Sequence, residues 1–116
     1  MSGLTPGTVA DAATVALTHE PVPAEQVVTG APTTGFAELD AVDEAEIGVW
    51  EMTPGAMRDV EADEVFVVLA GSATVTFEDP AMSAIELRPG SAVRLTAGMR
   101  TVWTVRETLR KIYIAG

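Results

Sequence analysis

Hydrophobic and polar residues alternate along the chain from Phe36 to the C-terminus. Short runs rich in β-branched and aromatic residues are separated by the turn sequences TPG at 53–55, AGS at 70–72, EDP at 78–80 and RPG at 88–90. Alternation with a period of two, interrupted by Gly or Pro turns, is typical of half-buried β-strands. The pattern predicts strands at about 36–40, 46–52, 64–70, 72–78, 83–88, 91–96, 100–106 and 109–115.

This succession of short strands favours an all-β sandwich or barrel. The 116 residues are enough for one compact domain with its own hydrophobic core, and too few for two. Residues 1–35 differ, because they carry four prolines and four glycines and show little periodicity. We therefore expect two regions, an extended N-terminal arm over 1–35 and a barrel domain over 36–116.

The charge of the chain narrows the classes of partner. The formal net charge is −10, and residues 1–57 contain no Lys or Arg. Nucleic acids and anionic membrane surfaces are bound by concentrated basic faces, so neither is an expected partner. With no cysteine there is neither a disulfide framework nor a thiolate metal site. No secretory signal is visible, and the longest apolar run, Val65 to Ala70, is far shorter than a membrane span. We expect a cytoplasmic protein.

The predicted strand 64–70 is apolar on both faces. Successive side chains of a strand point to opposite sides, so Glu64, Phe66 and Val68 share one face, and Val65, Val67 and Leu69 share the other. A strand that is largely apolar on both faces suits the centre of a two-sheet sandwich. Its outer face then needs a cover, which either the arm or another subunit can provide. We expect a homodimer.

Two stretches carry a family resemblance. In EADEVFVVLAG at 61–71, Glu64 and Gly71 fit the second half of the first cupin motif, G-x5-H-x-H-x3,4-E-x6-G, and in RPGSAVRLTAG at 88–98, Gly90 and Gly98 fit the second motif, G-x5-P-x-G-x2-H-x3-N. The chain resembles a small single-domain cupin. The resemblance implies a jelly-roll barrel, the double-stranded β-helix.

A subgroup of cupins matches more closely. The runs GVWEMTPG at 48–55, VWTV at 102–105 and RKIYI at 110–114 are similar to the cupin_3 type, which includes the cupin domain named for (S)-ureidoglycine aminohydrolase. The resemblance covers about residues 36–116. It departs from that aminohydrolase in lacking a second cupin domain and the histidine ligands.

The metal ligands of the cupin motifs are replaced in this chain. The two His positions of the first motif fall on Arg58 and Val60, or on Met57 and Asp59 with the longer spacing, and Thr101 stands for the His of the second. A zinc, iron or copper site ordinarily needs three or four N, S or O ligands. We therefore predict no tightly bound transition metal and no cofactor.

Two other possible kinds of metal site have less support in the sequence. His19, the one histidine, lies in the arm and is expected at the surface. An all-oxygen magnesium or calcium site from Glu51, Asp59 and Glu64 is conceivable, but solvated acids at strand edges are the simpler expectation.

The resemblance places the candidate ligand site inside the barrel. There Glu64 is the candidate acid, base or hydrogen-bond acceptor. The alternative is a purely structural role, in which Glu64 forms an ion pair with Arg58 or Arg94. Arg58 would take an anionic group at the rim. Phe66, Thr101 and Trp103 would line the cavity. Tyr113 and Lys111, on one face of the last strand, would either reach it or seal a sheet edge with solvated charge. Trp50 is expected in the core.

Three functions remain open from the sequence. The first is binding of a small polar metabolite of the ureido, amino or keto acid type, with Arg58 on the anion and Glu64 on an N–H donor. The second is a metal-independent enzyme, a hydrolase, isomerase or deaminase, that uses Glu64 as acid or base. The third is a structural dimer with a vestigial pocket.

Overall fold

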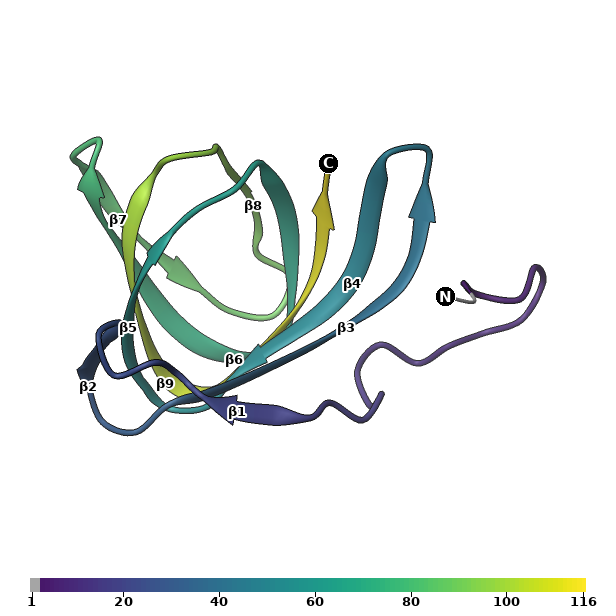
Figure 1. The fold of residues 1–116 in the computed structure, drawn as a ribbon, viewed down its shortest axis with the longest axis horizontal. Helices are drawn as coiled ribbons and strands as arrows, with labels where there is room; N and C mark the ends of the chain where they lie inside the picture. Colours follow the sequence, from purple (N-terminus) through teal and green to yellow (C-terminus); the bar gives the residue numbers. More distant parts are fainter. Residues whose placement is uncertain (1–2) are drawn as a thin grey trace.

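The computed structural model describes residues 3–116, and within them every regular element is a β-strand. The strands form one antiparallel sheet that curls on itself (Figure 1). The predicted all-β class is confirmed, and the curled sheet agrees with the barrel expected from the resemblance. The strands are β1 (His19–Pro21), β2 (Val27–Thr29), β3 (Thr33–Val42), β4 (Ala45–Met52), β5 (Gly55–Val60), β6 (Glu64–Asp79), β7 (Met82–Leu87), β8 (Ala92–Leu95) and β9 (Arg100–Ala115).

Two long strands, β6 and β9, hold the barrel together. They pair with each other from Glu64 and Ala115 to Asp79 and Arg100. The other edge of β9 pairs with β5 through its first half and with β4 through its second half. The other edge of β6 pairs with β8 and β7. Residues from β4, β5, β6 and β9 are thereby brought around one interior.

The continuity of β6 and β9 corrects the strand boundaries expected from sequence. The AGS turn at 70–72 was expected to separate two strands, but β6 runs through it as a bulged strand with register shifts on both sides of Gly71. Gly71 has φ +95°, and a Cβ there would overlap the backbone of Thr108 and Leu109 on β9. Glycine thus lets the two strands bend together without breaking.

Strand β5 was not expected from the sequence. Its residues, GAMRDV, show no clean alternation of apolar and polar positions, because charged side chains occupy both of its faces. Met57 is buried while Arg58 is exposed, and Asp59 is again partly buried. The strand therefore turns Met57 and Asp59 toward the interior.

The predicted faces of the strand that starts at Glu64 are confirmed. Phe66 and Val68 are 0% and 1% exposed in the core, whereas Val65 and Val67 on the outer face are each 37% exposed. Trp103, with Met52, Leu87, Leu95 and Leu109, contributes the largest fully buried side chains.

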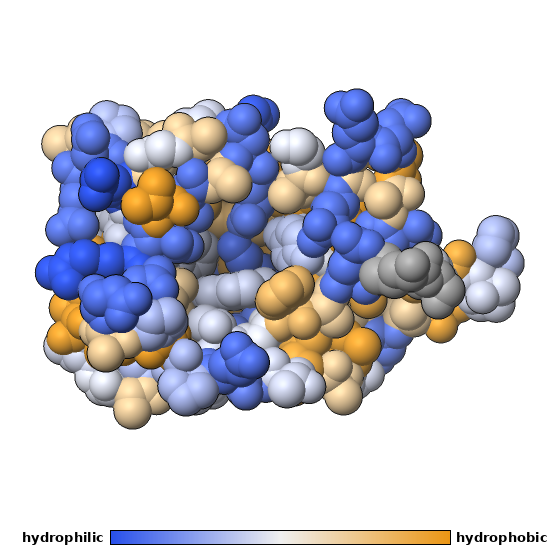
Figure 2. Space-filling model, viewed as in Figure 1, coloured by the Kyte–Doolittle hydropathy of each residue, from blue (hydrophilic) through white to orange (hydrophobic). Residues whose placement is uncertain are grey.

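The N-terminal arm lies along its own domain. β1 adds to β3 at one edge of the sheet and β2 adds to β5 at the other. Between residues 3 and 116 there is no helix of the length and apolar character that crossing a membrane requires. Figure 2 shows hydrophilic residues gathered at the tip of the β3–β4 hairpin.

His19, which was expected at the surface, is instead partly buried and anchors the arm. Its Nε2 lies 2.7 Å from Glu51 Oε1, and its Nδ1 lies 2.8 Å from Thr33 Oγ1. Arg110 donates from Nε to Glu51 Oε2 at 2.8 Å, and from Nη1 to the carbonyl oxygens of Ala12 and Val15. Burial opposes ionisation of Glu51, but the hydrogen bonds from Arg110 and His19 outweigh it and lower the pKa of that carboxyl.

Candidate functional site

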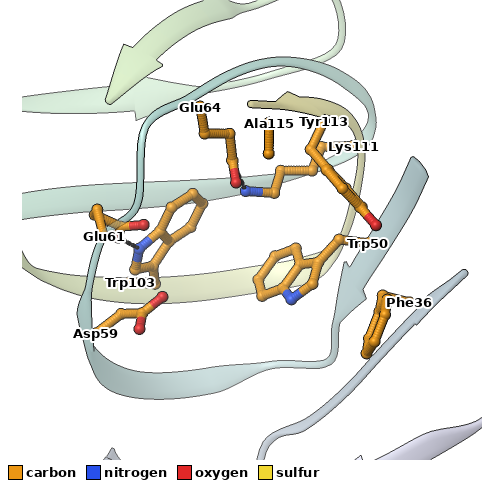
Figure 3. Close-up of a pocket in the computed structure, with 9 residues that line it drawn as sticks. All are labelled: Phe36, Trp50, Asp59, Glu61, Glu64, Trp103, Lys111, Tyr113 and Ala115. Atoms are coloured by element: carbon orange, nitrogen blue, oxygen red, sulfur yellow. Dashed lines mark hydrogen bonds and ion pairs between the residues drawn. The ribbon is translucent and has the colours of Figure 1, made fainter. Parts of the chain in front are cut away.

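The barrel contains a cavity of about 170 Å³ that opens beside β3 and β4 (Figure 3). Its walls combine aromatic rings with an unusual density of charge, three carboxylates and one ammonium. The lining residues are Phe36, Trp50, Asp59, Glu61, Glu64, Trp103, Lys111, Tyr113 and Ala115. Such a mixture of aromatic walls and a few polar groups is typical of small-molecule sites.

The buried Lys111 and the partly buried Glu64 form an ion pair on one side of this cavity. Lys111, from β9, is 4% exposed, and its Nζ donates to Glu64 Oε2 at 2.6 Å. The same Nζ lies 4.3 Å from the centroid of the Phe66 ring and 4.7 Å from those of Trp50 and Trp103. The sequence offered an ion pair as one of two roles for Glu64. The ion pair forms, but its partner is Lys111 rather than Arg58 or Arg94.

Glu61 accepts two hydrogen bonds at the back of the cavity. Its Oε2 receives the Thr101 hydroxyl at 2.6 Å and the Trp103 Nε1–H at 2.9 Å. Glu61 is 8% exposed, and Thr101 is fully buried. The network fixes the orientation of the Trp103 ring, whose face forms one wall of the cavity.

Asp59 differs from the other two carboxylates. Its Oδ1 accepts the backbone N–H of Val60 at 2.9 Å, but no side chain of residues 3–116 donates a hydrogen bond to it. Burial, and then the negative charge of Glu61, raise the pKa of Asp59 from 3.8 to about 6. Asp59 is therefore an acceptor in the cavity that takes up a proton near neutral pH.

The raised pKa of Asp59 predicts a pH-dependent stability. The folded protein keeps this proton up to about pH 6, whereas the unfolded chain loses it near pH 4, so Asp59 lowers the free energy of unfolding as the pH rises from about 4 to 6. Two pKa units correspond to ~3 kcal/mol, and partial exposure to water reduces this to roughly 1–2 kcal/mol. We expect Asp59→Asn to be more stable than the wild type by that amount at pH 7.5. Urea unfolding should show the difference vanish below about pH 4, and a difference independent of pH would contradict it.

Tyr113 forms the upper wall of the cavity. Its hydroxyl donates to Glu46 Oε2 at 2.5 Å, and burial together with this contact raises the pKa of the phenol. A Cβ on Gly48 would overlap the Tyr113 ring, so the glycine of the GVWE run gives the ring its place against β4.

The structure brings most of the sequence-predicted site residues together. Glu64, Trp103 and Tyr113 line the cavity, and the fully buried Phe66 and Thr101 lie directly behind it, in contact with Lys111 and Glu61.

Arg58 is the exception, and its predicted place at the cavity rim is wrong. It is exposed, and it is not one of the residues that line the cavity. On β5 it follows Met57 and precedes Asp59, both of which turn inward, so its side chain leaves on the opposite face.

Sequence reasoning gave the carboxylates Asp59 and Glu61 no part in the ligand site. Asp59 was weighed only as a metal ligand, and Glu61 was not singled out. Their spacing of two residues, continuing the inward parity of Met57, was the signal that could have found both. Trp50, expected in the core, packs against the core and also lines the cavity.

The residues at the cupin metal positions do not fit a transition metal. The inward pair of the first motif is Met57 and Asp59, Glu64 is engaged by Lys111, and Thr101 donates its hydroxyl to Glu61. Within residues 3–116, no three His, Asp or Glu side chains converge in a way that would hold a metal ion. Glu51, weighed as an oxygen ligand beside Asp59 and Glu64, instead binds His19 and Arg110 at the arm.

Comparison with known proteins identifies the family. Residues 39–113 match the model of the EutQ-like cupin domain, described as Cupin_3. The chain belongs to the EutQ-like cupin family. The cupin resemblance is thereby confirmed, while the ureidoglycine aminohydrolase-like subtype stays a prediction. No curated protein matches the chain in sequence.

Solved structures show the same fold. A DUF861-family protein of unknown function from Pseudomonas syringae pv. tomato DC3000 superposes on 86% of this chain and 44% of its own, with a TM-score of 0.72 and 22% identity. The EutQ protein of Clostridium difficile covers 72% of this chain, with a TM-score of 0.59 and 17% identity. The chain spans 61% of that EutQ chain. A DUF1255 protein of unknown function from Acidithiobacillus ferrooxidans matches 96% of this chain and 98% of its own, with a TM-score of 0.61 and 21% identity. At these identities the likeness is one of fold.

Proposed function

We propose that this EutQ-like cupin binds a small metabolite that carries an amide or ureido group, without a tightly bound transition metal. The observation behind the proposal is that Asp59, which lacks a side-chain donor among the described residues, faces the same cavity as the Lys111 ammonium. Lys111 has three N–H donors, and within residues 3–116 only Glu64 receives one. An amide offers the complement, a carbonyl oxygen for Lys111 and N–H groups for Asp59. Trp50 and Trp103 supply flat walls for its planar group.

The charges of the cavity narrow the ligand class expected from sequence. The anion-binding half of that expectation rested on Arg58, which points away from the cavity. The lining holds three carboxylates against one ammonium, so a keto acid or another simple anion would be repelled. A neutral amide or urea suits the remaining groups.

A metal-independent enzyme acting on the same ligand is the second candidate. A pKa of about 6 suits Asp59 for proton transfer near neutral pH, whereas Glu64 is committed to Lys111. In a hydrolase Asp59 would take the proton of an attacking water. The proposed general base thus moves from Glu64 to Asp59.

Thermal-shift measurements test the ligand class. We expect the neutral compounds acetamide and N-methylurea to raise the melting temperature of the wild type, and pyruvate not to do so. Asp59→Leu removes the acceptor and should abolish the response, while Arg58→Ala, outside the cavity, should keep it. Stabilisation that survives Asp59→Leu, or a response to pyruvate alone, would contradict the proposal. Ammonia release from a stabilising compound would show that the site is catalytic.

We also propose that the chain forms a homodimer through the outer face of β6 and β9. On this face Val65 pairs with Ile114, and the side chains of Val65, Val67 and Ile114 are 37%, 37% and 42% exposed. A second copy would remove this apolar strip from water. Light scattering should give a dimer mass for the wild type and a monomer mass for Val67→Lys. Val9→Lys, at a position that is 95% exposed in the arm, should leave the dimer intact. A wild-type monomer at micromolar concentration would refute the interface.

A further inference from the structure

Lys111 is the only lysine of the chain, and it lies inside the barrel. Its ammonium meets one carboxylate oxygen, Glu64 Oε2, at 2.6 Å. Three aromatic rings enclose the same nitrogen, with centroids at 4.3 Å for Phe66 and 4.7 Å for Trp50 and Trp103. Figure 3 shows Lys111 with Glu64 and the two tryptophans. The three rings come from β4, β6 and β9, so the enclosure exists only in the folded barrel.

This enclosure has the chemistry of a site for a free cation. The faces of aromatic rings attract ammonium groups, and rings gathered around a cation are a common means of recognising ammonium ligands. A carboxylate adds the counter-charge. A buried lysine is otherwise costly, and it is retained only where such partners replace its water. The chain therefore fills a cation site with its own side chain.

Glu64 connects this observation to the replaced metal ligands of the cupin motifs. It occupies the position of the glutamate in the first cupin motif, and Lys111 Nζ now neutralises it. The Lys111 ammonium thus neutralises the charge of this carboxylate, as a metal ion does in cupins that bind one. It also orients Glu64, with no ligand needed from outside.

We propose that Lys111 is a built-in cation, held in a site of one carboxylate and three rings, which takes the place of a bound metal ion in this cupin. The proposal does not depend on the identity of the metabolite, because it concerns the ion pair that shapes the cavity. It implies that the enclosure, emptied of the lysine side chain, binds a free primary alkylammonium.

Chemical rescue of Lys111→Ala is the test. This substitution removes Cγ, Cδ, Cε and Nζ, and n-propylammonium carries the same atoms. We expect Lys111→Ala to melt at a lower temperature than the wild type, and n-propylammonium to restore at least half of the loss along a saturable curve. n-Propanol, which fills the same space without charge, and sodium chloride at equal concentration should not restore it.

Two control variants separate a site from a general salt effect. Lys111→Met refills the space with an apolar side chain and should not respond to n-propylammonium. Arg106→Ala removes an exposed cation that pairs with Glu86, and it should not respond either. Equal rescue by n-propanol, or a response shared by all three variants, would overturn the proposal. So would a folded Lys111→Ala protein that shows no saturable response.

The wild-type protein provides a test that does not require the alanine variant to fold. Labelling with ¹⁵N-lysine gives a single side-chain signal, which should show contacts to the Trp50 and Trp103 ring protons and a ring-current shift. A signal like that of a solvent-exposed lysine would overturn the enclosure. Elemental analysis of protein purified without added metal should give clearly substoichiometric manganese, iron, nickel and zinc. One equivalent of any of them, lost in Glu64→Ala, would show that a metal occupies the site instead.

Discussion

Replacing Glu64 with glutamine is expected to lower the free energy of unfolding by about 2–4 kcal/mol. The Lys111 ammonium would keep its charge in a buried position without its carboxylate, and removing one partner of a buried ion pair is strongly destabilising. In a domain of this size, such a loss lowers the melting temperature by roughly 8–16 °C. Urea unfolding followed by circular dichroism measures the change.

The double variant distinguishes this pair from two independent losses. Glu64→Gln combined with Lys111→Met removes both charges, so the cost should be smaller than the sum of the single costs by roughly 1–3 kcal/mol. Arg106→Ala and Glu86→Gln, the matched exposed pair, should show coupling below about 1 kcal/mol. Strict additivity at Glu64 and Lys111 would mean that the contact carries no energy of its own.

Replacing Glu61 with alanine should cost about 2–3 kcal/mol of stability. It deletes the acceptor of two hydrogen bonds from fully buried donors, the Thr101 hydroxyl and the Trp103 indole. Hydrogen bonds to a charged group are worth about 1.5–3 kcal/mol each, but Trp103 Nε1 also lies 3.1 Å from Thr101 Oγ1, and this contact remains. Chemical unfolding gives the cost, and tryptophan fluorescence reports the environment of the indole.

Glu61→Gln is the matched control for that result. Its amide oxygen still accepts from both donors, so we expect a loss of no more than about 1 kcal/mol. A glutamine variant as unstable as the alanine variant would indicate that the negative charge, rather than the acceptor, is what the network needs.

Asp59 and the other charged groups of the cavity thus affect stability in opposite directions. Glu61, Glu64 and Lys111 satisfy one another or their neighbours, and the barrel depends on them. Asp59 lowers stability at neutral pH and has no side-chain donor among residues 3–116. Buried charges that lower stability are concentrated at functional sites, which agrees with our proposal that Asp59 contacts the ligand.

The sequence by itself determined the fold class, the family resemblance and the inward face of β6. Alternation with period two is a local property, because neighbouring side chains of a strand must leave on opposite faces. This rule placed Glu64, Phe66 and Val68 on one face, the cupin resemblance made that face the interior, and the structure confirms it. The same rule missed β5, where charged residues lie on both faces.

Only the tertiary structure decided how the charges pair. Lys111 meets Glu64 across 47 positions of sequence, and Glu61 meets Thr101 across 40. The sequence correctly predicted which side chains of β9 share a face. This alternation does not say which strand lies beside β9. Arg58 and Arg94 were therefore the expected partners of Glu64, and the actual partner, Lys111, follows only from the register of β6 against β9. That register is set by packing along the whole length of both strands and by the bulge at Gly71, and the pairing of distant charges follows from it.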